Sequence, residues 1–482
     1  MLASWIARCE ERPKLALAVC ALLLAAQVGP WWYSSVDSAS YLSMARSLAQ
    51  GTGPTNLGSR LLWYSPGYPA LISPLFLVGD RPLFWLSAFQ WFGAVGLMLG
   101  VYQWCRRVAP DAAVWIACLT VVNHGLWLHF RRPLSEIAFL CLLVWTVNLL
   151  SSVWQASKWA FAFRLSTACL LVALVCLVRP VGIMLAPGLA VSAFFDALRG
   201  RATWLRAVVA SLAVAAAAAL PVAWFVSHER RIAAELDGRT YVDEFRDAAR
   251  TPLASCSSGV QMCVSDIGRV CIPGLFKSHG VLGDWTNVNM LIHLPFFALI
   301  CYGWRAWTRG QGDPLAWYMP FYFLLIAAHA VDTGARLMLP LLPALLVCLW
   351  YALRGLGRQR QLVFAVCLAL QASVAGGYWL IYDLPRARNF DQCWADVDRL
   401  AAVIHADPGP VLALELPDDL HLMLELALDR SVSRGHASAA EPARWLVAPC
   451  DSSLAAEVLP SRAMQPCCRT AHLVCHRLTE KR

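Results

Sequence analysis

Charged side chains are scarce in this chain of 482 residues. Asp, Glu, Lys and Arg make up 15% of the sequence, whereas soluble globular domains contain about 25%. Hydrophobic residues make up 59%, and the mean hydropathy is +0.53. Because so few charges cannot cover a large water-exposed surface, the composition predicts an integral membrane protein.

A clustered basic patch is also missing. The formal net charge is +9, but the Lys and Arg residues stand singly between apolar runs. A nucleic-acid surface needs its cations gathered on one face, whereas scattered cations are typical of the cytoplasmic loops of membrane proteins. We therefore expect membrane lipids around this chain and no nucleic-acid partner.

Metal-site spacing is absent among the 18 cysteines. No CxxC pair is followed by a second pair at the spacing of a structural zinc site. Eight cysteines fall in the segments predicted below to be external: Cys256, Cys263, Cys271, Cys393, Cys450, Cys467, Cys468 and Cys475. An oxidising compartment permits disulfides among them, and their pairing cannot be deduced from the sequence.

Long apolar runs dominate what is present. A helix needs about 20 such residues to cross a bilayer. We predict eleven spans, at residues 14–31, 83–105, 112–130, 134–154, 160–178, 181–198, 204–227, 288–304, 314–331, 337–353 and 362–382. The sequence contains no internal repeat. The first run lacks a small-residue cleavage site and is followed by Trp31, Trp32 and Tyr33. It therefore resembles an uncleaved span with an aromatic belt.

The orientation follows from the short loops. Every second loop carries at least two cations: Arg8, Arg12 and Lys14; Arg106 and Arg107; Lys158 and Arg164; Arg199, Arg201 and Arg206; Arg305 and Arg309; and Arg354, Arg358 and Arg360. Positively charged loops face the cytoplasm. We therefore expect a cytoplasmic N-terminus and, with an odd number of spans, an extracytoplasmic C-terminus.

Two domains are expected. Residues 1–382 would form the transmembrane domain, with long external loops at 34–82 and 228–287. Residues 383–482 are more polar, and strand-like runs at 410–417, 444–449 and 470–478 alternate with a helical run at 419–427. This alternation predicts a small extracytoplasmic α/β domain.

Several ionisable residues lie on the predicted outer side, although the positive-inside rule concentrates cations on the cytoplasmic side. They are the cations Arg131, Arg132, Arg179, Lys277 and Arg336 and the acids Asp37, Glu136 and Asp332. Ionisable groups at a membrane cost free energy and usually mark a substrate site or an ion pair. Acids and cations together can bind a phosphate-bearing substrate and accept a proton.

Structural alternatives remain open for these residues. They are an Asp332–Arg336 pair one turn apart, a helix-dipole role for Glu136, lipid-headgroup contacts for Arg131 and Arg132, and an N-cap role for Asp37. We expect no bound metal as cofactor. Binding of a divalent ion by His129, His279 and His329, which all lie on the predicted outer side, stays open as an alternative.

The segment after Asp37 predicts an amphipathic helix over 38–50. Tyr41, Leu42, Ala45 and Leu48 share one face, which suits a helix in the interface plane that fixes Asp37 at the lipid–water boundary. The next segment, 61–74, contains Tyr64 and Tyr68, whose rings suit an interface or a sugar face. A further amphipathic stretch, 228–252, predicts a helix that covers a cavity.

An ordered series of motifs resembles one family. It comprises D-x3-Y-x3-A-x2-L-x2-G from Asp37 to Gly51, then YSPGYP, PLSEIAF and LVRPVG, and finally R-x3-P-x2-P from Arg336. The series covers roughly residues 1–382 and is similar to the GT-C-type membrane glycosyltransferases that use a lipid-phosphosugar donor. That branch includes protein O-mannosyltransferases and lipid A aminoarabinose transferases.

The resemblance implies an inverting transfer of a sugar from a polyprenyl-monophosphate donor to a lipid, glycan or protein acceptor. Asp37 occupies the position of the family's catalytic acid in the first external loop. For such a donor, the charged and aromatic residues of the predicted outer side are our candidates for binding the lipid phosphate and sugar: Arg179, Arg336, Lys277, Arg131, Glu136, Tyr64 and Tyr68. The resemblance also implies a bacterial inner membrane. Protein O-mannosyltransferases have two adjacent acids where this chain has Asp37 and Ser38, which disfavours protein mannosylation.

A membrane transporter or a flippase of lipid-linked sugars is the alternative function. It would also place charges within a helix bundle. The sequence shows no internal symmetry and no paired broken helices in matching halves, which are typical of transporters. A catalytically inactive lipid-binding scaffold is a second alternative, and substitution of Asp37 distinguishes it from an enzyme.

Overall fold

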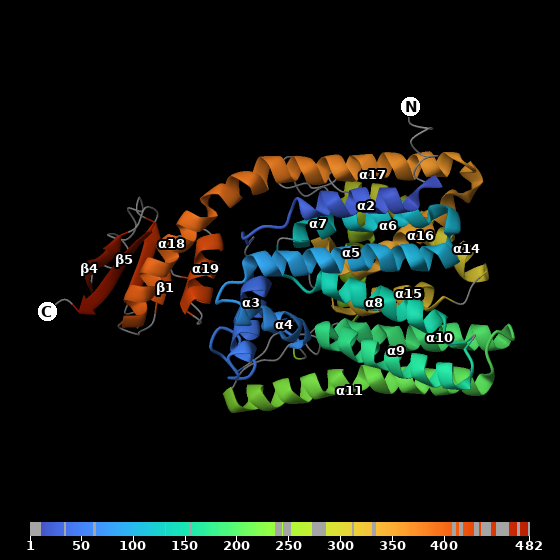
Figure 1. The fold of residues 1–482 in the computed structure, drawn as a ribbon, viewed down its shortest axis with the longest axis horizontal. Coiled ribbons are helices and arrows are strands. Elements are labelled where there is room, and N and C mark those ends of the chain that lie inside the picture. Colours follow the sequence, from blue (N-terminus) through green and yellow to red (C-terminus); the bar gives the residue numbers. More distant parts are fainter. Residues whose placement is uncertain are drawn as a thin grey trace. The chain divides into compact units, whose positions relative to one another are not determined.

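The computed structural model describes most of the chain (Figure 1). The described residues are 11–32, 35–60, 64–130, 132–154, 156–236, 243, 252–271, 286–310, 313–329, 334–406, 411–413, 418–428, 433–434, 445–449, 462–469 and 473–480. Two compact units are present. The helical unit comprises Met1–Val28, Ser87–Phe130 and Ser135–Tyr378, and the loop-and-tail unit comprises Gly29–Leu86, Arg131–Leu134 and Trp379–Arg482.

The helical unit is built mainly of long, mostly apolar helices. Its α-helices are α2 (Pro13–Ala25), α5 (Leu83–Val108, whose first residues belong to the other unit), α6 (Ala113–Val122), α7 (His124–Phe130), α8 (Glu136–Ser151), α9 (Lys158–Val178), α10 (Leu185–Leu198), α11 (Trp204–Leu236), α13 (Pro252–Cys271), α14 (Thr286–Gly310), α15 (Pro314–His329), α16 (Leu342–Ala352) and α17 (Gln359–Tyr378). Its 3₁₀ segments are η2 (Pro110–Ala112), η3 (Pro180–Met184), η4 (Gly334–Leu341) and η5 (Leu353–Leu356).

Six helical segments of the described chain are long and apolar enough to cross a membrane: Leu83–Val108, Lys158–Val178, Pro180–Leu198, Trp204–Glu235, Arg336–Leu356 and Gln359–Ile381. A seventh is formed by Pro110–Val122 and His124–Phe130 if this pair, bent by 50°, is one span. Helical residues occur at each of the eleven predicted positions. The protein is therefore an integral membrane protein, and the count of eleven spans stays a prediction.

The helices cross at very short distances where glycine lies in the contact. Helices α14 and α16 meet at Gly303, where an added Cβ would overlap the carbonyl oxygen of Cys348. Helices α10 and α15 meet at Gly188, where a Cβ would lie 2.7 Å from the backbone nitrogen of Tyr318. Because glycine has no side chain, the backbones themselves make these contacts.

The break between α6 and α7 is held by two amide side chains. The Asn123 Oδ1 accepts a hydrogen bond from the backbone nitrogen of Gly125 at 2.9 Å, and its Nδ2 donates to the carbonyl of Val270 at 2.7 Å. The Gln371 Oε1 accepts from the backbone nitrogen of His124 at 3.0 Å, and its Nε2 donates to the carbonyl of Cys271. These bonds satisfy backbone groups that a bent helix and the end of α13 leave unpaired.

The loop-and-tail unit combines helices with a sheet. Its helical elements are α3 (Val36–Ala49), α4 (Gly67–Ile72), η1 (Ser73–Leu77), the π-helical turn η6 (Trp379–Asp383), α18 (Leu384–Ala406) and α19 (Asp418–Leu428). Its strands are β1 (Val411–Ala413), β2 (Ser433–Arg434), β3 (Trp445–Pro449), β4 (Arg462–Arg469) and β5 (Leu473–Glu480). The strand order is β2-β1-β3-β5-β4, parallel from β2 to β3 and antiparallel from β3 to β4.

β1, α19, β3 and β5 lie at the predicted strand and helix positions, whereas α18, β2 and β4 were not predicted. Helix α18 packs on β4 and β5 (Figure 1). The segment after the first apolar run belongs to the same unit. The guanidinium of Arg81 lies over the ring of Trp394 at 4.1 Å and pairs with Asp398, and Arg46 donates to the carbonyl of Leu426 at 2.9 Å. Residues 29–86 and the tail therefore pack into one body.

The helix expected over 38–50 is present as α3, but the polar face predicted for it is not exposed. The helix α3 is not half exposed at an interface, because it is buried on nearly all sides and its polar residues bond to backbone: Ser43 accepts from Leu57 and Ser47 from Thr55. The stretch 228–252, also expected to be helical, is helical over 228–236, where it continues α11. Its role in covering a cavity stays a prediction. Residues 237–242 and 244–251 lie outside the described chain.

Candidate substrate site

A buried carboxylate holds two arginines in the helical unit. Glu136 is completely buried at the first turn of α8. Its Oε1 accepts a hydrogen bond from Arg179 Nη1 at 2.7 Å and another from Arg336 Nε. Its Oε2 is buried without a hydrogen-bond partner in the described chain. We call Glu136, Arg179 and Arg336 the Arg–Glu–Arg cluster.

Local sequence explains how these residues reach one point. Arg179 follows the last residue of α9 in an extended conformation, φ −147° and ψ 122°, because Pro180 disfavours the helical conformation for the residue before it. Arg336 lies on the 3₁₀ segment η4, which packs on α8 and α13. Glu136 comes from the N-terminus of α8, where the helix dipole also favours an acid.

The cluster carries a net charge of +1 in its ordinary ionisation state. Two guanidinium groups face one carboxylate, and guanidinium stays protonated in proteins. The side chains of Arg179 and Arg336 are 14% and 23% exposed, so the excess charge is mostly withdrawn from water. An excess cation in a partly dry site attracts an anion much more strongly than a surface cation does.

Other side chains lie near the cluster. The guanidinium of Arg179 lies 5.9 Å from the ring centroid of Phe139, and His129 of α7 interacts electrostatically with Glu136. The hydroxyl of Tyr318 is buried without a hydrogen-bond partner among the described residues, and it interacts electrostatically with Arg179. A phosphate or a sugar hydroxyl could use such a hydroxyl.

Tyr318 was missed by sequence reasoning. It lies inside the apolar run of α15, where a tyrosine reads as a core residue. The available signal was a pair of tyrosines, Tyr318 and Tyr322, four residues apart in an otherwise aliphatic and aromatic helix. Their rings lie 5.3 Å apart on one helix face.

Asp37 lies in the loop-and-tail unit, on the first turn of α3. The N-cap of this helix is Ser35, whose side chain accepts from the backbone of Ser38 while the Ser38 side chain accepts from the backbone of Ser35. The alternative that Asp37 caps the helix is therefore wrong. Its carboxylate instead accepts a hydrogen bond from the Tyr64 hydroxyl at 2.7 Å.

Three tyrosine rings contact one another in a row that ends at the Asp37 carboxylate. The ring centroid of Tyr41 lies 5.2 Å from that of Tyr64 and 5.1 Å from that of Tyr68. Tyr41 and Tyr68 are buried, whereas Tyr64 and Asp37 are partly exposed. The structure thus brings together Asp37, Tyr64 and Tyr68, which the sequence had named separately.

Other predicted site residues lie outside the described chain. They are Arg131, Lys277, His279 and Asp332. The alternative that Asp332 pairs with Arg336 therefore stays a prediction. Arg336 pairs with Glu136. Within the described ranges, no group of three or more His, Cys, Asp or Glu residues could hold a metal ion.

Comparison with known proteins gives structural neighbours. No family model and no curated protein sequence matches the chain. Among solved structures, ArnT from Cupriavidus metallidurans bound to undecaprenyl phosphate has a TM-score of 0.57 and 12% identity, with 96% of this chain and 97% of that chain covered. The oligosaccharyltransferase AglB from Archaeoglobus fulgidus, in complex with an inhibitory peptide and a dolichol-phosphate, has a TM-score of 0.55 and 14% identity, with 90% and 69% covered.

Identities this low show the fold alone. The chain has the fold of these membrane glycosyltransferases, and the resemblance to the GT-C type that the motifs indicated is confirmed at that level. The apo form of ArnT matches over the same shares of both chains, with a TM-score of 0.54.

Proposed function

We propose that this protein is an inverting glycosyltransferase that takes a sugar from a polyprenyl-monophosphate donor. The acceptor would be lipid A, another cell-envelope glycan or a protein. The observation that carries the proposal is the Arg–Glu–Arg cluster, a buried site of net charge +1 in a membrane protein of this fold.

The cluster supplies what the leaving group needs. Transfer breaks the bond between the anomeric carbon and the phosphate oxygen, and the polyprenyl phosphate departs with that electron pair. Cationic donors placed where this charge develops stabilise the transition state more than the ground state. Arg179 and Arg336 would bind the phosphate, Glu136 would hold them in position, and Lys277 and Arg131 would add further cations.

Asp37 would act as the base. The acceptor oxygen or nitrogen bonds to the anomeric carbon from the face opposite the phosphate, and its proton passes to the Asp37 carboxylate. The hydrogen bond from Tyr64 fixes the orientation of that carboxylate. Tyr64 and Tyr68 would offer ring faces and hydroxyls to the sugar.

Membrane placement is part of the proposal. The site would open on the extracytoplasmic side of a bacterial inner membrane, with the N-terminus in the cytoplasm. The catalytic domain would comprise residues 1–382, and residues 383–482 would form an extracytoplasmic domain. The two neighbours bound to lipid phosphates support this assignment of donor class by their shared fold.

The first experiment separates phosphate binding from turnover. The full chain is purified in detergent, and binding of undecaprenyl phosphate is titrated for the wild type and for Arg179→Gln, Arg336→Gln and Asp37→Asn. Loss of a charge-assisted hydrogen bond should weaken binding about tenfold or more in each arginine variant. Arg199→Gln is the matched control, because Arg199 is exposed at the end of α10 and should bind normally.

The second measurement is mass spectrometry of envelope glycolipids and glycoproteins from cells that express each variant. Asp37→Asn should bind the lipid phosphate yet lose about 100-fold or more of the transferred sugar. Unchanged glycan products with Asp37→Asn would refute the transferase. If that variant instead altered only the distribution of a lipid-linked sugar across the membrane, the flippase alternative would hold.

A further inference from the structure

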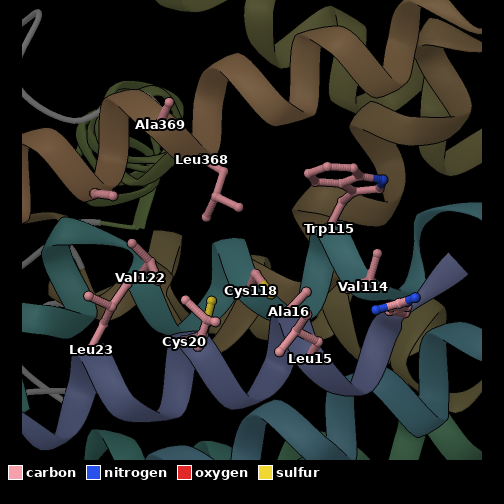
Figure 2. A pocket seen from close by; sticks show the side chains of 13 residues that line it. Leu15, Ala16, Cys20, Leu23, Val114, Trp115, Cys118, Val122, Leu368 and Ala369 are labelled. Atoms are coloured by element: carbon pink, nitrogen blue, oxygen red, sulfur yellow. The ribbon is translucent and has the colours of Figure 1, made fainter. Parts of the chain in front are cut away.

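The helical unit contains an apolar groove. Its lining residues are different from those of the Arg–Glu–Arg cluster and come from other helices. Helices α2 and α17 both pack on α6, which forms the floor between them (Figure 2). The groove has a volume of about 440 Å³, within the range of about 300–1,000 Å³ that ligand pockets span. None of Glu136, Arg179 and Arg336 lines it.

Apart from Arg12 at one end, the lining of the groove is apolar. Leu15, Val19 and Leu23 contribute from α2, Val114 and Val122 from α6, and Leu368 from α17 (Figure 2). Cys20 and Cys118 add thiols, which behave as small hydrophobic groups when buried. A wall of this kind contacts an alkyl chain and offers nothing to a sugar or a peptide backbone.

The length of the groove matches one leaflet. The lining residues of α2 run from Arg12, just before the helix, to Leu23. Eleven residues of helix rise by about 16 Å, which is about half of a hydrocarbon core of about 30 Å. A single acyl chain of one leaflet therefore spans the groove from the interface to the bilayer centre.

A cation lies at the interfacial end. Arg12 is exposed, and within the described chain its guanidinium forms no ion pair and no hydrogen bond. A guanidinium is suited to a phosphate, which it binds through two parallel hydrogen bonds. By the predicted orientation, this end faces the cytoplasmic leaflet, where anionic lipids attract arginine.

We propose that this groove binds an anionic phospholipid of the leaflet on the Arg12 side, with one acyl chain between α2 and α17 and the phosphate on Arg12. This proposal does not rest on the proposed glycosyl transfer, because none of its lining residues belongs to the Arg–Glu–Arg cluster. A net anionic headgroup is required, because a zwitterionic one brings a second positive charge next to the guanidinium.

Native mass spectrometry of the full chain in detergent tests the charge requirement. Phosphatidylglycerol and phosphatidylcholine with the same acyl chains are added in turn, and the bound fraction is measured. Arg12→Gln should weaken phosphatidylglycerol binding roughly fivefold. Lys14→Gln is the matched control, because Lys14 is an exposed cation two residues away that does not line the groove. Equal loss in both variants would overturn the proposal.

A steric test fills the groove instead. Ala16 lines the groove, whereas Ala18 on the same helix is exposed and does not. Ala16→Trp should therefore lose the bound phosphatidylglycerol, and Ala18→Trp should retain it. Retention by Ala16→Trp would refute the site, and Arg12→Gln keeps the proposal testable if the Trp variant does not fold.

Two other occupants are distinguished in the same samples. A dimer that dissociates with Arg12→Gln but ignores added phosphatidylglycerol would assign the groove to a second copy of the chain. Undecaprenyl phosphate that competes with phosphatidylglycerol and is displaced by Ala16→Trp would assign it to the donor lipid. Either result overturns the phospholipid proposal.

Discussion

A completely buried carboxylate needs compensating charge, and Glu136 has two guanidinium groups on a single oxygen. Desolvating an ion costs several kcal/mol, which only close opposite charges repay. Removing the acid would leave two like charges side by side with no anion between them. The arginines therefore depend on Glu136 for their positions, which makes it a positioning residue.

Glu136→Gln should lower both stability and donor binding. We expect a destabilisation of about 3 kcal/mol, because breaking a buried pair leaves uncompensated charge. Thermal unfolding of the detergent-solubilised chain, followed by tryptophan fluorescence, measures it. Asp111→Asn is the control: it breaks a 3.5 Å pair with Arg360 in which Asp111 is 67% exposed, so the loss should stay below about 1 kcal/mol. Equal melting temperatures of the two variants would contradict the positioning role.

The individual residues of the cluster could be named from sequence, but their pairing could not. Charges that oppose the positive-inside trend identified Glu136, Arg179 and Arg336. The local rule favoured Asp332 as the partner of Arg336, since it lies four residues away. The observed partner lies 200 residues away, and only the packing of η4 on α8 brings it there.

At the scale of elements, glycine sets the distance between helices. At Gly303 of α14 there is no room for a side chain against the backbone of Cys348 on α16. Membrane helices gain little from the hydrophobic effect between one another, so close van der Waals packing has to hold them. A methyl group at such a crossing must push the two backbones apart.

Gly303→Ala should destabilise the protein by about 1–3 kcal/mol through overpacking. Gly376→Ala on α17 is the matched control, because an added Cβ there meets nothing within 4 Å. It should be neutral or stabilise by up to about 1 kcal/mol, as alanine favours a helix over glycine. Thermal unfolding of both variants in the same detergent compares them. A Gly303→Ala protein as stable as the wild type would show that α14 and α16 do not meet this closely.

Some elements followed from sequence and others did not. The strand at β3 and the helix α19 lie where alternation and apolar spacing placed them. The helix α13 was missed, because its Ser-rich and Cys-containing sequence lacks a long apolar run and its burial comes from α14, α15 and η4. Periodicity cannot report contacts that tertiary packing supplies.

For the whole molecule, composition was sufficient to predict a membrane protein and motif order to predict the fold. The number of spans is harder to derive, since α8 and α15 are apolar but have only 16 residues each. Proline also divides helical segments, as at Pro180 between α9 and η3. Apolar length in a sequence does not show where such a break falls.

The predicted orientation is testable with inserted epitopes. Gly51, after α3, is predicted to be outside, and Gly357, before α17, inside; both are exposed glycines with positive φ in turns that tolerate insertion. An epitope at Gly51 should bind antibody in intact spheroplasts, whereas one at Gly357 should bind only after permeabilisation, because Arg354, Arg358 and Arg360 hold that loop in the cytoplasm. The permeabilised samples control for antibody access. Labelling of both sites in intact spheroplasts would refute the topology.

The amides at the break of α6 link two distant parts of the helical unit. Asn123 follows Val122, and Gln371 precedes Ala372, so both amides adjoin residues of the lipid groove. The same amides donate hydrogen bonds to the last two carbonyls of α13. Helix α13 packs on η4, the segment that carries Arg336. A lipid that separated α2 from α17 would therefore displace the end of α13 through these two hydrogen bonds. Helix α13 would transmit that displacement to Arg336, whose guanidinium we assign to the departing phosphate.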